Sequence, residues 1–221
     1  MRCIICQQEV IRDVTWQTFL KPPERKKICN HCSHLLEPIY SPCCPSCHRP
    51  DQELTCKDCL QWFESHPGLL DRNVSVFKYN EFNKELVARW KYRGDYVLVE
   101  AFKEEIQKKW LSAGYQGRKV VQVPLSEQRL MERGFNQSDA IIKVLEEEPL
   151  AIFARTHGEK QSKRGKKDRM HALNPFTLQL SISEPVVIID DIYTTGRTVR
   201  HMADLLKKQG CSSVSSFTIF R

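Results

Sequence analysis

The densest group of chemically active side chains lies between Val186 and Thr198, in the stretch VVIIDDIYTTGRT. Two adjacent carboxylates, Asp190 and Asp191, follow a run of β-branched residues that is typical of a strand buried on both faces. Paired carboxylates at the carboxyl end of such a strand suit a ribose diol or a magnesium ion. The stretch therefore predicts a sugar or metal site at that edge of a sheet.

The residues after the acidic pair are typical of a phosphate-binding turn. A short segment rich in hydroxyls leads into a helix that we expect to begin near Thr198. The first amides of a helix are free to donate to an anion, and the helix dipole adds a partial positive charge there. Gly196 allows a phosphate to approach the backbone closely. The side chains that add donors or a cation are those of Thr194, Thr195, Arg197 and Thr198.

This stretch resembles the 5-phosphoribosyl-1-pyrophosphate (PRPP) motif of type I phosphoribosyltransferases. The resemblance implies that Asp190 and Asp191 are the catalytic pair and bind the ribose hydroxyls, that residues 194–198 cradle the 5′-phosphate, and that Mg²⁺ accompanies PRPP. In these enzymes a loop after an early strand grips the pyrophosphate, and two arginines stand at that position here; a solvated basic turn is the alternative for them. The PRPP-binding residues so implied are Asp190, Asp191, Tyr193, Thr194, Thr195, Gly196, Arg197, Thr198, Arg129 and Arg133.

Eight of the ten cysteines form Cys-x-x-Cys pairs within the first 59 residues. Two such pairs supply the four thiolates of a tetrahedral zinc site, so the sequence predicts two structural Zn²⁺ ions in a double zinc ribbon. Sequential pairing assigns the ligands as Cys3, Cys6, Cys29 and Cys32 for one ion, and Cys44, Cys47, Cys56 and Cys59 for the other. Crossed pairing stays open, and Cys43 is an alternative to Cys44, which we favour.

The chain is a globular protein by composition, with 221 residues, 41% of them hydrophobic, and a formal net charge of +7. It opens with Met1-Arg2-Cys3 and has no hydrophobic stretch behind this start. We therefore expect no signal peptide and no membrane insertion, and a cytoplasmic protein whose thiols stay reduced.

The elements that must position these residues follow from the hydrophobic periodicity. Residues 1–66 show little periodicity and cannot build a core of their own size, whereas residues 67–221 alternate between strand and helix patterns. We predict an α/β chain with an N-terminal zinc ribbon module over residues 1–66 and a type I phosphoribosyltransferase-like parallel sheet flanked by helices over residues 67–221. The predicted strands are 74–79, 119–123, 185–189 and 214–220, and the predicted helices are 82–92, 97–111, 136–147 and 198–210.

A strongly basic segment covers residues 155–169, with seven basic against two acidic side chains. It fits a mobile lid over an anionic substrate and fits a DNA backbone equally well, and an exposed disordered loop is the third possibility. The residues that we predict to contact DNA are Lys163, Arg164, Lys166 and Lys167.

Further motifs narrow the family. The stretches LKPPERKKICNHC, KYRGD, VPLSEQRLMERGFNQS and EKQSKRGKKDR together resemble the ComF competence proteins over nearly the whole chain. The resemblance implies a cytosolic factor for DNA uptake that handles single-stranded DNA and acts with a ComFA-type helicase ATPase. The alternative is a working phosphoribosyltransferase that transfers phosphoribosyl to an unidentified acceptor, with the ribbon as scaffold.

Overall fold

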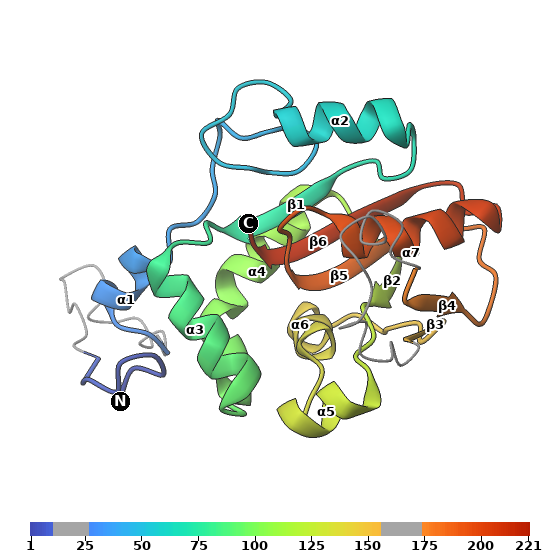
Figure 1. Ribbon diagram of the computed structural model, residues 1–221. Coiled ribbons are helices and arrows are strands. Elements are labelled where there is room, and N and C mark those ends of the chain that lie inside the picture. The colour runs from blue at the N-terminus through green and yellow to red at the C-terminus, as the bar shows by residue number, and fades with distance from the viewer. Residues whose placement is uncertain (11–26, 156–173) are drawn as a thin grey trace, which may run out of the picture.

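The structure is a computed structural model that describes residues 1–10, 27–155 and 174–221 (Figure 1). Its centre is a parallel sheet of four strands in the order β1-β6-β5-β2. The strands are β1 (Asn73–Phe77), β2 (Lys119–Gln122), β5 (Val186–Ile192) and β6 (Val214–Phe220). The predicted parallel sheet is confirmed.

The strand register brings the carboxyl ends of β5 and β6 together. Asp190 of β5 is paired with Thr218 of β6, and Ile189 is paired with Gln122 at the end of β2. β5 continues to Ile192, whereas β2 ends opposite Ile189. The acidic pair therefore lies near the carboxyl end of β5, beyond the end of β2.

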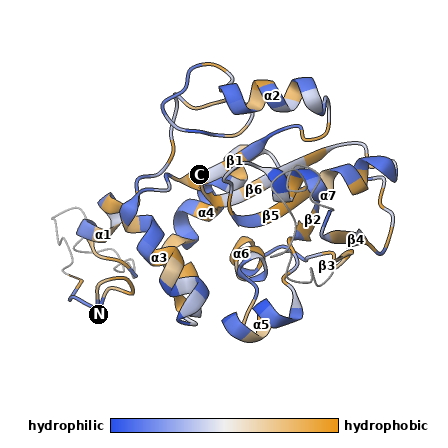
Figure 2. Ribbon diagram, viewed as in Figure 1, coloured by the Kyte–Doolittle hydropathy of each residue, from blue (hydrophilic) through white to orange (hydrophobic). Residues whose placement is uncertain are grey.

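Helices cover both faces of the sheet. Side chains alternate along β5, so Val187 and Ile189 pack on one face and Val186 and Ile188 on the other. The first face is covered by α3 (Glu81–Tyr92), α4 (Val99–Ala113) and α6 (Gln137–Leu145), and the second by α7 (Arg197–Lys208). Each fully buried aliphatic side chain contributes about 1.5–3 kcal/mol through the hydrophobic effect. Hydrophobic and hydrophilic residues accordingly alternate around helices such as α3 (Figure 2).

The cysteine-rich region is divided between the two cores. Cys3 and Cys32 pack into the core with α3 and α4, whereas Cys44 and Cys59 pack into the core with α7. The short helices α1 (Asn30–Leu35) and α2 (Lys57–Ser65) belong to this region. The region thus shares the hydrophobic cores of the sheet, as expected for a segment without a core of its own, and a boundary at residue 66 stays a prediction.

The structure also contains elements that the periodicity did not indicate. The segment after β2 forms a helix, α5 (Glu127–Arg133), where we expected a pyrophosphate-binding loop. The side chain of Ser126 caps its first turn, and Gly134 ends it with a left-handed φ of 77°. A 3₁₀ turn, η1 (Tyr96–Leu98), precedes α4, and β3 (Phe153–Arg155) pairs antiparallel with β4 (Phe176–Leu178). None of the helices in the described ranges is long and apolar enough to cross a membrane.

Candidate functional site

Asp190 and Asp191 lie side by side at the carboxyl end of β5, where the sequence places them. The backbone amide of Asp191 donates a 2.9 Å hydrogen bond to Oδ1 of Asp190. Burial, together with the neighbouring charge of Asp191, raises the pKa of Asp190 to about 7. The site therefore contains a carboxyl group that changes its charge near neutral pH.

Lys91 faces this acidic pair and was given no role in the site by the sequence. It lies in the last turn of α3, and its Nζ is 2.6 Å from Oδ2 of Asp191, with both side chains nearly buried. The signal available was the motif KYRGD, which begins at this lysine. An ion pair of this kind fixes the carboxylate and balances part of the negative charge at the strand end.

The loop between β5 and α7 has the geometry expected for phosphate binding. Gly196 has a left-handed φ of 75°, and a Cβ at this position would lie 2.2 Å from both the hydroxyl of Tyr193 and Nη1 of Arg200. Only glycine fits here without a clash. Thr194 and Thr195 are exposed on this loop, as is Arg197 at the start of α7. The helix begins at Arg197, one residue before the predicted start.

Tyr193 packs against the loop at Gly196. Its side chain is buried, and Nη1 of Arg200 donates a hydrogen bond to its hydroxyl. Burial raises the pKa of Tyr193 to about 12, so the hydroxyl keeps its proton. The same guanidinium group donates to the carbonyl of Gly196 at 3.4 Å. Arg200 is a residue of the site that the sequence analysis did not single out.

Arg155 lies near Asp190, and two further arginines lie near Arg155. The structure places Arg129 and Arg133 on α5 and Arg155 at the end of β3. Burial lowers the pKa of Arg155, the charges of Arg129 and Arg133 lower it further, and Asp190 raises it. Arg155 is thus close enough to interact with the charges of Arg129, Arg133 and Asp190, and the excess of positive charge around it favours an anion at this position.

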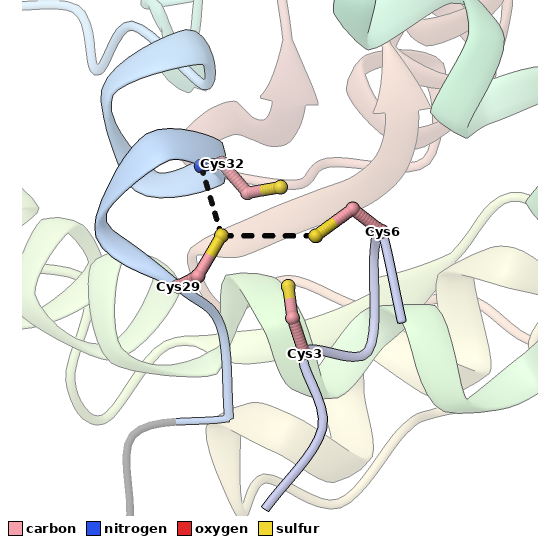
Figure 3. A group of neighbouring side chains, drawn as sticks. All are labelled: Cys3, Cys6, Cys29 and Cys32. Carbon is pink, nitrogen blue, oxygen red and sulfur yellow. Dashed lines mark hydrogen bonds between the residues drawn. The ribbon is translucent and has the colours of Figure 1, made fainter. Parts of the chain in front are cut away.

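The cysteines gather into two groups, and the sequential assignment agrees with both. Cys3, Cys6, Cys29 and Cys32 form one group and Cys44, Cys47, Cys56 and Cys59 the other, with all four sulfur atoms of each group within 4.8 Å of one another. In the first group the four sulfurs point toward a common centre (Figure 3). Crossed pairing is therefore wrong for this arrangement.

The two groups are built in the same way. In each, a turn carries the first pair, and the residue after that pair, Gln7 or His48, has a positive φ. The second pair opens a helix, with Cys29 preceding α1 and Cys56 preceding α2. The backbone of Cys43 forms an isolated antiparallel β-bridge with Pro50 beside the second turn. Cys43 is not in the group, which agrees with our preference for Cys44.

The donor set and its spacing fit zinc. In a tetrahedral site with Zn–S bonds of about 2.3 Å, the sulfurs lie about 3.8 Å apart. The Sγ atoms of Cys6 and Cys29 are 3.7 Å apart, and those of Cys47 and Cys56 are 3.6 Å apart. A hydrogen bond from Cys59 and the guanidinium of Arg221 lower the pKa of the Cys47 thiol to about 4, which favours the thiolate that a metal requires. Two groups that could each hold one zinc ion are therefore present.

Lys163, Arg164, Lys166 and Lys167, which we expect to contact DNA, lie outside the described residues. Their role stays a prediction from charge.

Two comparisons with known proteins each match part of this chain. The phosphoribosyl transferase domain family matches residues 130–221, which include the acidic pair, the loop and Arg133. A hypoxanthine phosphoribosyltransferase from Staphylococcus aureus covers 52% of this chain and 62% of its own chain, with 22% identity and a TM-score of 0.30. The sheet, the acidic pair and the loop define a phosphoribosyltransferase-type domain.

The relatives that match the whole chain define the family more narrowly. Competence protein ComFC of Bacillus subtilis (strain 168) is 37% identical over 99% of this chain and 94% of its own length. ComFC of Streptococcus pneumoniae is 28% identical over 100% of both chains. The DNA utilization protein YhgH of Salmonella typhimurium is 29% identical over 88% of this chain and 90% of its own. The chain belongs to the ComFC family of competence proteins.

Proposed function

We propose that this protein binds PRPP with Mg²⁺ at the carboxyl end of the sheet and binds single-stranded DNA through its basic segment. In this proposal it acts in the cytoplasm during DNA uptake, together with a ComFA-type helicase ATPase. Membership of the ComFC family supports the role in competence. The observation that carries the PRPP site is the placement of paired carboxylates directly before a glycine loop that opens α7.

Each group of residues in the site has a charge that suits a different part of PRPP. Asp190 and Asp191 offer acceptors to the two ribose hydroxyls, and Lys91 holds Asp191 in place. The loop that contains Gly196 receives the 5′-phosphate on its amides and hydroxyls. Arg129, Arg133 and Arg155 supply positive charge for the pyrophosphate.

Magnesium fits this site as an ion that arrives with PRPP. The carboxylate oxygens of Asp190 and Asp191 are its preferred type of ligand, but Lys91 already pairs with Oδ2 of Asp191. When bound, Mg²⁺ would neutralise charge on the departing pyrophosphate. The protein's own part is to hold the ribose against the two carboxylates, whose negative charge stabilises positive charge at C1.

The excess of arginine charge also favours the second candidate function, transfer of phosphoribosyl to an acceptor. Arg155 lies near Asp190, and Arg129 and Arg133 lie near Arg155, so their charges could stabilise a leaving pyrophosphate there. Release of pyrophosphate from PRPP, measured with and without DNA and candidate bases, distinguishes turnover from binding alone.

The experiment that tests the site is calorimetric titration of Mg²⁺–PRPP into the full chain. The double substitution Asp190→Asn and Asp191→Asn removes the charged oxygens that would accept hydrogen bonds from the ribose hydroxyls. We therefore expect PRPP affinity to fall at least about tenfold. Asp204→Asn is the matched control, because Asp204 pairs with Lys208 near the end of α7. Unchanged affinity in the double variant would rule out this site.

Binding to a single-stranded oligonucleotide is measured on the same proteins. The double aspartate variant should keep its DNA affinity, and an equal loss of both ligands would show that the two sites are one. Neutralising Lys163, Arg164, Lys166 and Lys167 to glutamine should leave PRPP affinity intact. It should also reduce the slope of log K against log salt by up to about three for single-stranded DNA. An unchanged slope would place the DNA site elsewhere.

A further inference from the structure

Arg221 connects the second cysteine group to the loop that precedes α7. Its Nη2 lies 3.3 Å from Sγ of Cys47, and its Nε donates to the carbonyl of the same residue at 3.2 Å. Its Nη1 donates to the carbonyls of Tyr193 at 3.2 Å and Thr194 at 2.8 Å. One guanidinium group therefore bonds a metal-ligand candidate and the loop at the same time.

Trp62 makes a second connection between the same two parts. It lies on α2, one helical turn after Cys59, and its Nε1 donates to the carbonyl of Thr195 at 3.0 Å. The guanidinium of Arg200 stacks on its ring at 4.4 Å and also donates to the carbonyl of Gly196 at 3.4 Å. Because Cys56 directly precedes α2 and Cys59 lies in its first turn, the position of this tryptophan depends on the cysteine group.

These contacts decide which way the loop amides face. In a trans peptide unit, the carbonyl of one residue and the amide of the next point in opposite directions. Holding the carbonyls of residues 193–195 toward the cysteine group thus turns the amides of Thr194, Thr195 and Gly196 to the other side. Within the described ranges, none of these three amides donates a hydrogen bond, which leaves them available for an anion.

We propose that Arg221 and Trp62 are positioning residues that hold the phosphate loop open for PRPP and couple the affinity for PRPP to the metal in the second cysteine group. The inference rests on the proposed PRPP site. Four thiolates around Zn²⁺ carry a net charge of about −2, which the guanidinium of Arg221 partly balances. Metal keeps Cys47 and the start of α2 in place, and through them Arg221 and Trp62 keep the loop in the binding conformation.

Coupling between two binding sites is reciprocal. Bound PRPP must therefore slow the loss of zinc from the second group. The first group packs into the core on the other face of the sheet and bonds α3 instead, through the 2.8 Å hydrogen bond from Arg89 to the carbonyl of Ile5. It serves as an internal comparison, because its hydrogen bond runs to α3 and not to the phosphate loop, so PRPP should affect its zinc less.

The test compares the wild-type chain with Arg221→Gln, Arg221→Lys and Trp62→Phe. Arg118→Gln is the matched control, because Arg118 stacks on Tyr115 and bonds Ser213 at the opposite end of the sheet. Two quantities are measured: the Kd of Mg²⁺–PRPP, and the rate of zinc release to an excess of a chromogenic chelator with and without PRPP. We expect PRPP to slow release of one of two zinc ions in the wild type and in Arg118→Gln.

Arg221→Gln should bind PRPP about tenfold more weakly and lose the effect of PRPP on zinc release. Arg221→Lys should recover part of the affinity, since it keeps the charge but not the fork of donors. Trp62→Phe keeps the ring under Arg200 and loses only the bond to Thr195, so it decides the question should Arg221→Gln lose metal or fail to fold. Trp62→Phe should weaken PRPP binding and reduce the extent to which PRPP slows zinc release.

The outcomes separate the two claims. Failure of the wild-type chain to bind PRPP overturns the proposed function. The coupling is overturned if the wild type binds PRPP and the folded Arg221 and Trp62 variants bind it with equal affinity. It is also overturned if PRPP binds the wild type without changing the rate of zinc release. Either result leaves the PRPP site in place.

Discussion

Asp190 and Asp191 are neighbours in the sequence, yet they meet different surroundings. Asp191 is paired with Lys91, whereas burial, and after it the like charge of Asp191, raises the pKa of Asp190. The sequence identified both acids because their position after a run of β-branched residues is a local pattern. It did not identify Lys91, because the ion pair depends on how α3 folds back over the strand end.

The raised pKa of Asp190 makes stability depend on pH. Its value of about 7 in the folded chain exceeds the value of about 4 expected after unfolding. Between these values the folded state binds more protons, so the free energy of unfolding decreases as pH rises. Asp190→Asn removes this contribution, and we expect the variant to exceed the wild type in stability at pH 8 by on the order of 2 kcal/mol.

Urea unfolding of both proteins at several pH values between 5.5 and 8.5 measures this effect. The stability difference should grow with pH up to about pH 7 and then level off. Because both proteins contain the same cysteines, any effect of pH on their metal cancels in the comparison. A difference that does not depend on pH would show that Asp190 ionises normally.

At the scale of elements, hydrophobic periodicity predicted what local sequence determines. The strand 214–220 agrees with β6, and the helix expected to begin near Thr198 agrees with α7. The helical pattern of α7 stops just before Gly210. The helix α5 was missed because it is only seven residues long, although Ser126 and Gly134 mark its two ends.

The arrangement around the phosphate loop could not be predicted in the same way. Gly196 was assigned from its conformational freedom, but the close packing of Tyr193 and Arg200 beneath it appears only in the fold. The contacts of Trp62 and Arg221 to the loop join residues that are 133 and 27 or 28 positions apart. No spacing rule connects such residues, because their meeting depends on strand order and on the path of α2.

At the scale of the whole molecule, the cysteine groups stabilise the sheet from both faces. One group packs into the core with α3 and α4, and the other into the core with α7. The spacing of the pairs predicted the two ligand sets, and their division between two cores followed only from the structure. Loss of either metal should therefore weaken the sheet itself.

Metal analysis of the purified chain should return two zinc ions. Replacing Cys56→Ser together with Cys59→Ser removes two ligands of the second group, so this variant should hold one zinc ion and unfold at a lower temperature. Cys43→Ser is the matched control, because Cys43 lies beside the second group without belonging to it. It should keep two zinc ions, and a single ion in the wild-type chain would contradict the assignment of two sites.

The most direct test of the account is a crystal structure of the chain with PRPP and Mg²⁺ bound. The ribose hydroxyls should lie within hydrogen-bond distance of Asp190 and Asp191, and the 5′-phosphate should bind the amides of Thr194, Thr195 and Gly196. A structure at saturating PRPP with this edge of the sheet free of ligand, or with the phosphate bound away from these amides, would contradict it.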